Sequence, residues 1–216
     1  MPVSSRCSDR TDVIPVALVT EDRISSHVAN VLLRDATPPF TVELELPGTQ
    51  RRRFAAGSGQ IEKRIGRFNT AAEHRPFVVF LDLDDRPCAP SYRSALLPEG
   101  ARRYMVLRIA VREIESWLLA DRHGVAEYLG VSLEVVPKSP DELADPRRSL
   151  FDLVSRSRRR TIKEAILPID STARIGPDYN GALMRMVDDH WSRDRAADRS
   201  PSLRRAIDAL ERFRFP

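Results

Sequence analysis

Cysteine is nearly absent from this 216-residue sequence: it has Cys7 and Cys88, far apart and without histidine at metal-ligand spacing. We therefore expect neither a disulfide framework nor a cysteine-based zinc site. The apolar runs, such as residues 78–81, fall far short of the roughly 20 residues that a membrane helix needs. The amino terminus lacks the apolar segment of a signal peptide. These absences predict a soluble, cytoplasmic protein with no membrane partner.

Several motifs of familiar chemistries are also missing. The four histidines are scattered, and no HExxH or paired-ligand spacing occurs among them. There is no Walker A motif and no GxGxxG, and the glycine pair at 57 and 59 is too short a segment for a phosphate-binding loop. No serine has the context of a nucleophile elbow. Zinc hydrolase, nucleotide-binding and serine hydrolase chemistry are therefore not predicted.

Lysine is rare: three of the 35 basic residues are lysines and the other 32 are arginines, against 31 acidic residues and a net charge of +4. The planar guanidinium group suits phosphate oxygens, although the codon bias of a GC-rich genome is an alternative explanation. Two clusters are predicted to contact a nucleic-acid backbone: residues 51–53, and Arg156, Arg158, Arg159 and Arg160. For the second cluster, a solvated turn or ion pairs with acids at 141–145 is the competing interpretation.

Strand-like and helix-like segments alternate along the first half of the chain. Apolar runs and one strictly alternating segment predict strands at 14–19, 40–46, 76–81 and 104–111. Apolar residues at helical spacing predict helices at 24–33, 61–72 and 203–213. This alternation predicts an α/β fold with a mainly parallel sheet flanked by helices.

The expected organisation has three parts. Residues 1–12 form a polar arm, residues 13–121 an α/β domain, and residues 122–216 a helical part that packs on it. Apolar residues make up 42% of the chain, enough for a sizeable core.

Acidic residues follow the predicted strands. The clusters are Glu21 and Asp22, then Asp82, Asp84 and Asp85, then Glu113 and Glu115. In open α/β sheets the ligand site lies outside the carboxyl ends of the strands, so the first two clusters are predicted to converge. Converging carboxylates repel one another, and Mg²⁺ or Mn²⁺ would relieve that repulsion and support displacement at phosphorus. The alternatives are ordinary helix capping for the first cluster and a polar loop for the second.

The third cluster depends on where its helix begins. On a helix, Glu113 and Glu115 would lie about 200° apart, so at most one would join the site unless the helix begins after Glu113. Trp117 is predicted to be a core residue rather than a base-stacking platform.

These residues resemble the Toprim signature. A Toprim domain has a glutamate after its first strand and an Asp-x-Asp after a later one, and together they bind Mg²⁺; Glu21 and Asp82-Leu83-Asp84 are the matching residues. The first strand is followed by Thr20-Glu21-Asp22, where Toprim domains commonly have Glu-Gly.

Nearly the whole chain also resembles a bacterial domain-of-unknown-function family placed among Toprim-like proteins. The segments that carry this likeness are 111–121 and 200–203. Within the first, Glu115-x-Trp117-Leu118-Leu119 resembles the glutamate motif of Toprim-like proteins in phage-defence systems.

The resemblance implies a Mg²⁺- or Mn²⁺-dependent nuclease of DNA or RNA, near the overcoming-lysogenisation-defect branch. It implies that Glu21 binds a metal or acts as general base, that Asp82 and Asp84 ligate metal, and that Glu115 supplies a carboxylate either behind the metal ligands or to a second metal. It also implies a separately encoded ATPase partner in phage defence. A homodimer stays open. A non-catalytic Toprim-like module that binds a protein or nucleic acid is the main alternative, and a receiver-like phosphoacceptor is the other.

Overall fold

The computed structural model describes residues 13–45 and 58–216. The expected polar arm at 1–12, with Cys7, and the arginine cluster at 51–53 lie outside the described residues. Within the described ranges, no helix has both the length and the apolar character to cross a membrane.

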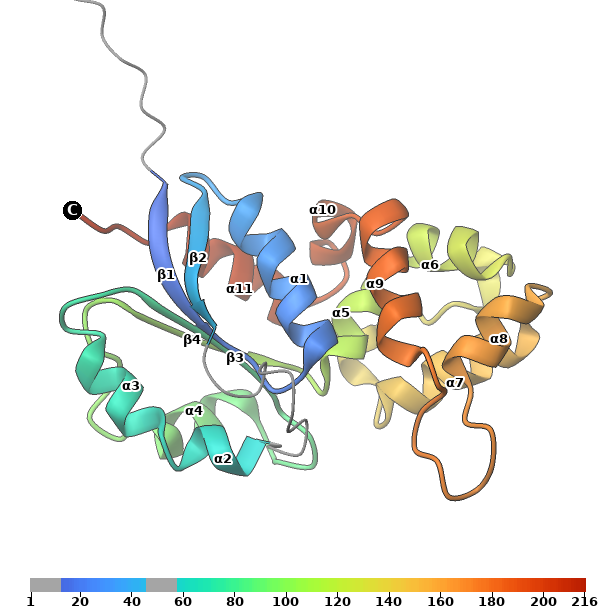
Figure 1. The fold of residues 1–216 in the computed structure, drawn as a ribbon, viewed down its shortest axis with the longest axis horizontal. Coiled ribbons are helices and arrows are strands. Elements are labelled where there is room, and N and C mark those ends of the chain that lie inside the picture. The colour runs from blue at the N-terminus through green and yellow to red at the C-terminus, as the bar shows by residue number, and fades with distance from the viewer. Residues whose placement is uncertain (1–12, 46–57) are drawn as a thin grey trace, which may run out of the picture.

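The centre of the molecule is a four-stranded sheet in which every neighbouring pair is parallel (Figure 1). Its strands are β1 (Ile14–Val19), β2 (Phe40–Glu45), β3 (Phe77–Asp82) and β4 (Met105–Ala110). The order is β2-β1-β3-β4, so β1 and β3 are central. The central strands are the continuous apolar runs because both of their faces are covered, whereas the edge strand β2 alternates and is mostly exposed. The predicted α/β fold with a parallel sheet is confirmed.

One face of the sheet is covered by short helices from the first half of the chain (Figure 1). They are α2 (Ser58–Glu62), α3 (Ile65–Ala71) and α4 (Ala89–Leu96). The single helix predicted over 61–72 is thus two helices. The amide of Arg64 bonds to the carbonyl of Ile61 at 2.9 Å, three residues back, and this tight turn separates them.

The other face is covered by α1 (Arg23–Arg34) and by the helical second half of the chain. The elements of that half are α5 (Ile114–Ala120), α6 (Arg122–Leu129), η1 (Leu133–Val135), η2 (Pro140–Glu142), α7 (Pro146–Arg156), α8 (Arg160–Ile166), α9 (Tyr179–Asp189), α10 (Arg193–Ala197) and α11 (Pro201–Glu211). The helices at the carboxyl end return to the sheet, where α11 packs on β4.

A single hydrophobic cluster joins this face of the sheet to the helical half. Trp117 belongs to this cluster, and 0% of its surface is exposed. The centroid of its ring lies 5.6 Å from that of Phe80 in β3, in an edge-to-face arrangement. Its indole N–H donates to Ser202 Oγ of α11 at 2.8 Å. Trp117 is a core residue, as predicted, and it ties the helical half to the sheet.

Candidate functional site

The candidate site lies where β1 and β3 end side by side. The connection from β1 leads to β2 on one side, and β3 lies on the other, so their carboxyl ends form the switch point of the sheet. Glu21 is the second residue after β1, and Asp82 is the last residue of β3. Glu21 Oε1 accepts the backbone N–H of Asp82 at 2.8 Å. The structure thus brings Glu21 and Asp82 together across the two central strands.

Asp82 is an acid in a crowded, buried position. Only 7% of its surface is exposed, and among the described residues no donor bonds to its carboxylate. Burial raises the pKa of Asp82 well above its usual value, and the negative charges of Glu21 and Glu115 raise it further. Burial likewise raises the pKa of Glu21 to about 7, although the Asp82 amide acts in the opposite direction.

Asp22 and Glu21 have different roles. Asp22 caps α1, because its carboxylate accepts the backbone N–H of Ser25 at 2.8 Å. Helix capping therefore explains Asp22, but Glu21 turns away from the helix towards Asp82.

Asp84 lies at the rim of the site in a left-handed conformation, with φ of 51°. Its amide donates to the carbonyl of Arg112 at 3.0 Å, and its carboxylate pairs with Arg86 at 3.2 Å. Arg86 also pairs with Glu62 and lies over the ring of Tyr92 at 4.0 Å. Aspartate tolerates left-handed backbone better than alanine, so asparagine is the informative replacement for Asp84.

Glu113 and Glu115 share one arginine. The helix α5 begins at Ile114, so Glu113 precedes it in extended conformation and the about 200° separation does not apply. Arg147, in the first turn of α7, reaches both: its Nη2 lies 3.7 Å from Glu113 Oε1 and its Nε 2.9 Å from Glu115 Oε1. The pKa of Glu113 is raised to about 7, mainly because the carboxyl group is buried and secondly because the negative charge of Glu115 lies nearby.

Glu115 is completely buried and held on one oxygen. Tyr179, the first residue of α9, donates its hydroxyl to Glu115 Oε1 at 2.5 Å, on the oxygen that Arg147 also contacts. The second oxygens of Glu113 and Glu115 have no surface exposure and no hydrogen-bond partner. Glu115 is therefore near Asp82, with one oxygen bound to Arg147 and Tyr179 and the other without a partner.

The donor chemistry at this edge fits a hard divalent cation, because it consists of carboxylate oxygens whose charges repel. These carboxylates do not form a complete metal site in the structure. Among residues 13–45 and 58–216, no set of three or more histidine, cysteine, aspartate or glutamate side chains is placed to hold a metal ion. Glu21 faces an amide and Asp84 faces Arg86, so both side chains would have to turn to join Asp82 on one ion.

Besides Arg86, the site contains Arg147 and Tyr179, which were not predicted from the sequence. They lie 32 and 64 residues beyond Glu115, on separate helices, and no motif surrounds them. Arg147 is one of two adjacent arginines, and only the fold distinguishes it from Arg148, which is exposed and pairs with Asp152.

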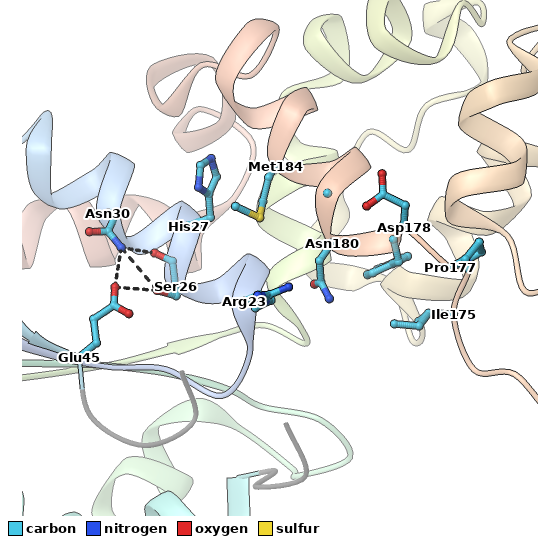
Figure 2. A pocket seen from close by; sticks show the side chains of 13 residues that line it. Arg23, Ser26, His27, Asn30, Glu45, Ile175, Pro177, Asp178, Asn180 and Met184 are labelled. Carbon is cyan, nitrogen blue, oxygen red and sulfur yellow. Dashed lines mark hydrogen bonds between the residues drawn. The ribbon is translucent and has the colours of Figure 1, made fainter. Parts of the chain in front are cut away.

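A cleft of about 510 Å³ opens between α1 and α9 beside the acidic edge (Figure 2). Arg23, the residue after Asp22, lies on the α1 side of the cleft. Tyr179 lies on the α9 side, and its hydroxyl donates to Glu115. Figure 2 shows that Ser26, Asn30 and Glu45 are linked to one another on one wall. The cleft is lined mainly by polar residues, and its residue Tyr179 bonds to Glu115 of the acidic edge.

The predicted arginine cluster lies at the junction of α7 and α8. Arg156, Arg158, Arg159 and Arg160 are all exposed. Arg160 pairs with Glu164 at 2.6 Å, and no ion pair among the described residues involves the other three. The proposed partners at 141–145 are engaged elsewhere: Asp141 accepts from Ser200 and Ser202, and Asp145 caps α7. Ion pairing with those acids is therefore wrong as an explanation, and the solvated turn remains the alternative.

Neutralising Arg158, Arg159 and Arg160 to glutamine together tests their predicted role. If they contact phosphates, the slope of log K against log salt should flatten by about two to three units, equally for all sequences. Arg199→Gln, an exposed arginine two residues before α11, is the control and should change the slope by no more than about one. An unchanged slope in the triple variant would support a solvated turn.

The raised pKa of Glu21 predicts how stability depends on pH in metal-free protein. Between about pH 4.5 and pH 7 the folded state holds a proton that the unfolded state has lost, so the free energy of unfolding should fall as pH rises. The contribution of Glu21 is up to about 3 kcal/mol. Urea unfolding at pH 5 and pH 8 with a chelator should show a smaller difference for Glu21→Gln than for the unaltered protein. Equal differences in the two proteins would contradict the pKa shift.

No family model matches the chain, and neither a curated protein nor a solved structure matches it. The likeness to Toprim domains and to the bacterial family therefore stays a prediction.

Proposed function

We propose that this protein is a Toprim-like phosphodiesterase that cleaves DNA or RNA with Mg²⁺ or Mn²⁺. The observation that supports it most directly is the meeting of Glu21 and Asp82 at the crevice between β1 and β3. Ligands bind at this place in open α/β sheets, and a buried acid pair has a strong electrostatic reason to take a cation there.

In this proposal Asp82 and Glu21 hold the cation from the two strands, and Asp84 completes the carboxylate set from the rim. The bound cation supplies an activated water and a counter-charge for the phosphate oxygens. Arg86 pairs with Asp84 and Arg147 pairs with Glu115, so guanidinium groups are present near the carboxylates to offset charge that develops on the phosphate.

Glu115 takes a positioning role in the proposal, rather than the role of a metal ligand. Its carboxylate fixes Arg147 at 2.9 Å, and Tyr179 fixes the same carboxylate oxygen. Removal of Glu115 would therefore act through the placement of Arg147.

The cleft between α1 and α9 is the proposed path for the nucleic-acid strand. Arg23 and Asn180 line it with hydrogen-bond donors suited to phosphate and sugar oxygens. The Asn30 amide is bonded to Ser26 and Glu45, and the carboxylates of Glu45 and Asp178 also line the cleft. Arg156 lies nine residues beyond Arg147 on α7, about 14 Å along the helix axis, so a strand leaving the site could reach the arginine cluster. A separately encoded ATPase and a role in phage defence belong to the same proposal.

A non-catalytic module is the second candidate. It is favoured by the open carboxylate arrangement, in which Asp84 pairs with Arg86 and Glu21 accepts an amide. A receiver-like phosphoacceptor is less favoured, because Asp82, which would be the acceptor, is only 7% exposed.

A cleavage assay separates these candidates. Labelled single- and double-stranded DNA and RNA are incubated with Mn²⁺ or Mg²⁺, and with a chelator as control. We expect cleavage of at least one substrate with metal and none with the chelator. Binding without cleavage under every condition would favour the non-catalytic module, and cleavage that survives chelation would contradict the proposed mechanism.

A further inference from the structure

Arginines gather at a second place, away from the carboxylates. A cavity of about 290 Å³ lies against β4, between α4 and the end of α11. Its walls carry five guanidinium groups, from Arg93 of α4, Arg103, Arg108 of β4, Arg212 and Arg214. The two helices that contribute to it cover opposite faces of the sheet, so three separate segments converge on this cavity.

Negative charge is scarce around this cavity. Arg212 pairs with Asp208 at 3.8 Å, and in the described part of the chain no other carboxylate lies within 4 Å of these five groups. Arg214 donates to the main-chain carbonyls of Glu211 and Phe213, and Arg103 lies over the ring of Tyr104 at 5.1 Å. These contacts orient the arginines without neutralising them.

Arg108 is the centre of this group. It is half-buried, and its Nε has no surface exposure and no hydrogen-bond partner. Burial lowers the pKa of Arg108, and the positive charges of Arg93, Arg212 and Arg205 lower it further. Buried charges in folded proteins are almost always paired, so this half-buried guanidinium group among like charges favours the binding of an anion beside it.

We propose that the cavity between α4, β4 and α11 binds a terminal phosphate group, from a free phosphate compound or from the end of a nucleic acid. The paired N–H donors of a guanidinium group match the spacing of phosphate oxygens. A terminal phosphomonoester carries nearly two negative charges and a diester carries one, so the arginines should favour the monoester. The volume of about 290 Å³ is enough for one or two phosphoryl groups. This site is separate from the carboxylates and does not depend on the proposed nuclease activity.

Calorimetric titrations with a chelator present test this proposal, because they require no metal and no cleavage. The probes are inorganic phosphate, pyrophosphate, a glutamate-rich peptide, and a ten-nucleotide single-stranded DNA with or without a 5′-phosphate. We expect saturable binding of pyrophosphate that weakens at least tenfold in Arg108→Met and in Arg93→Ala. Arg93 is exposed, so its variant keeps the test valid if Arg108→Met fails to fold. Arg199→Ala, at the other end of α11, is the matched control and should bind within twofold of the unaltered protein.

The probes also distinguish the source of the phosphate. Preference of at least tenfold for the 5′-phosphorylated DNA over its unphosphorylated form would identify a nucleic-acid end, and strong binding of pyrophosphate alone would identify a free phosphate compound. If both DNAs bind, and with equal affinity, the protein contacts the backbone rather than the terminal phosphate, and this would overturn the proposal. Absence of binding to every probe, equal binding of a glutamate-rich peptide, or equal affinity in the arginine variants would also overturn it.

Discussion

Replacing Asp82 by asparagine is expected to abolish metal-dependent cleavage, with a loss of at least about 100-fold in kcat. Asp82 is the most buried carboxylate of the pair at the switch point, and asparagine keeps its shape but removes the charge that would hold a cation. The variant should also lose the rise in melting temperature that millimolar Mn²⁺ gives the unaltered protein, since the cation binds only the folded state. Without metal it should be at least as stable, because one member of a repelling cluster is neutral.

Asp85→Asn is the matched control for this experiment. Asp85 lies three residues further along the chain, and its side chain is exposed. It should keep cleavage within about threefold and keep the full Mn²⁺ shift. An Asp82→Asn protein that retains both cleavage and metal stabilisation would contradict the assigned role of Asp82.

Replacing Arg147 by alanine is expected to lower the free energy of unfolding by about 2–4 kcal/mol. Glu115 is completely buried, and without Arg147 its charge would have no cationic partner within 4 Å among the described residues. The expected loss stays below that of a fully buried pair because 35% of the Arg147 side chain is exposed. Urea unfolding measures the difference.

Two further variants identify the cause of that loss. Adding Glu115→Gln to Arg147→Ala should restore part of the stability, because a neutral amide can still accept from Tyr179 and no longer needs a cation. Arg148→Ala removes the neighbouring arginine, whose side chain is 72% exposed, and should change stability by at most about 0.5 kcal/mol. If Arg147→Ala and Arg148→Ala are equally stable, the ion pair with Glu115 does not support the fold.

The sheet was predictable because its strands differ in burial. The central strands β1 and β3 are covered on both faces and are therefore apolar throughout, while the edge strand β2 alternates. The meeting of Glu21 and Asp82 followed from the same pattern, because the carboxyl ends of parallel strands lie at one edge.

The surroundings of the site were not predictable from local patterns. Arg147 contacts Glu115 because α7 packs against α5, and helix packing between distant segments leaves no spacing in the sequence. The position of Glu113 depended on a helix boundary, which is set by the conformation of one residue. The sequence shows that Arg86 is a charged residue, but only the folded structure shows that it contacts Glu62, Asp84 and Tyr92.

The most direct test of the central claim is a crystal structure of the protein grown with Mn²⁺ and measured near the manganese absorption edge. We expect an anomalous peak between the carboxylates of Glu21 and Asp82, with Asp84 turned away from Arg86 towards the ion. A crystal saturated with Mn²⁺ that shows no peak at the ends of β1 and β3 would contradict that claim.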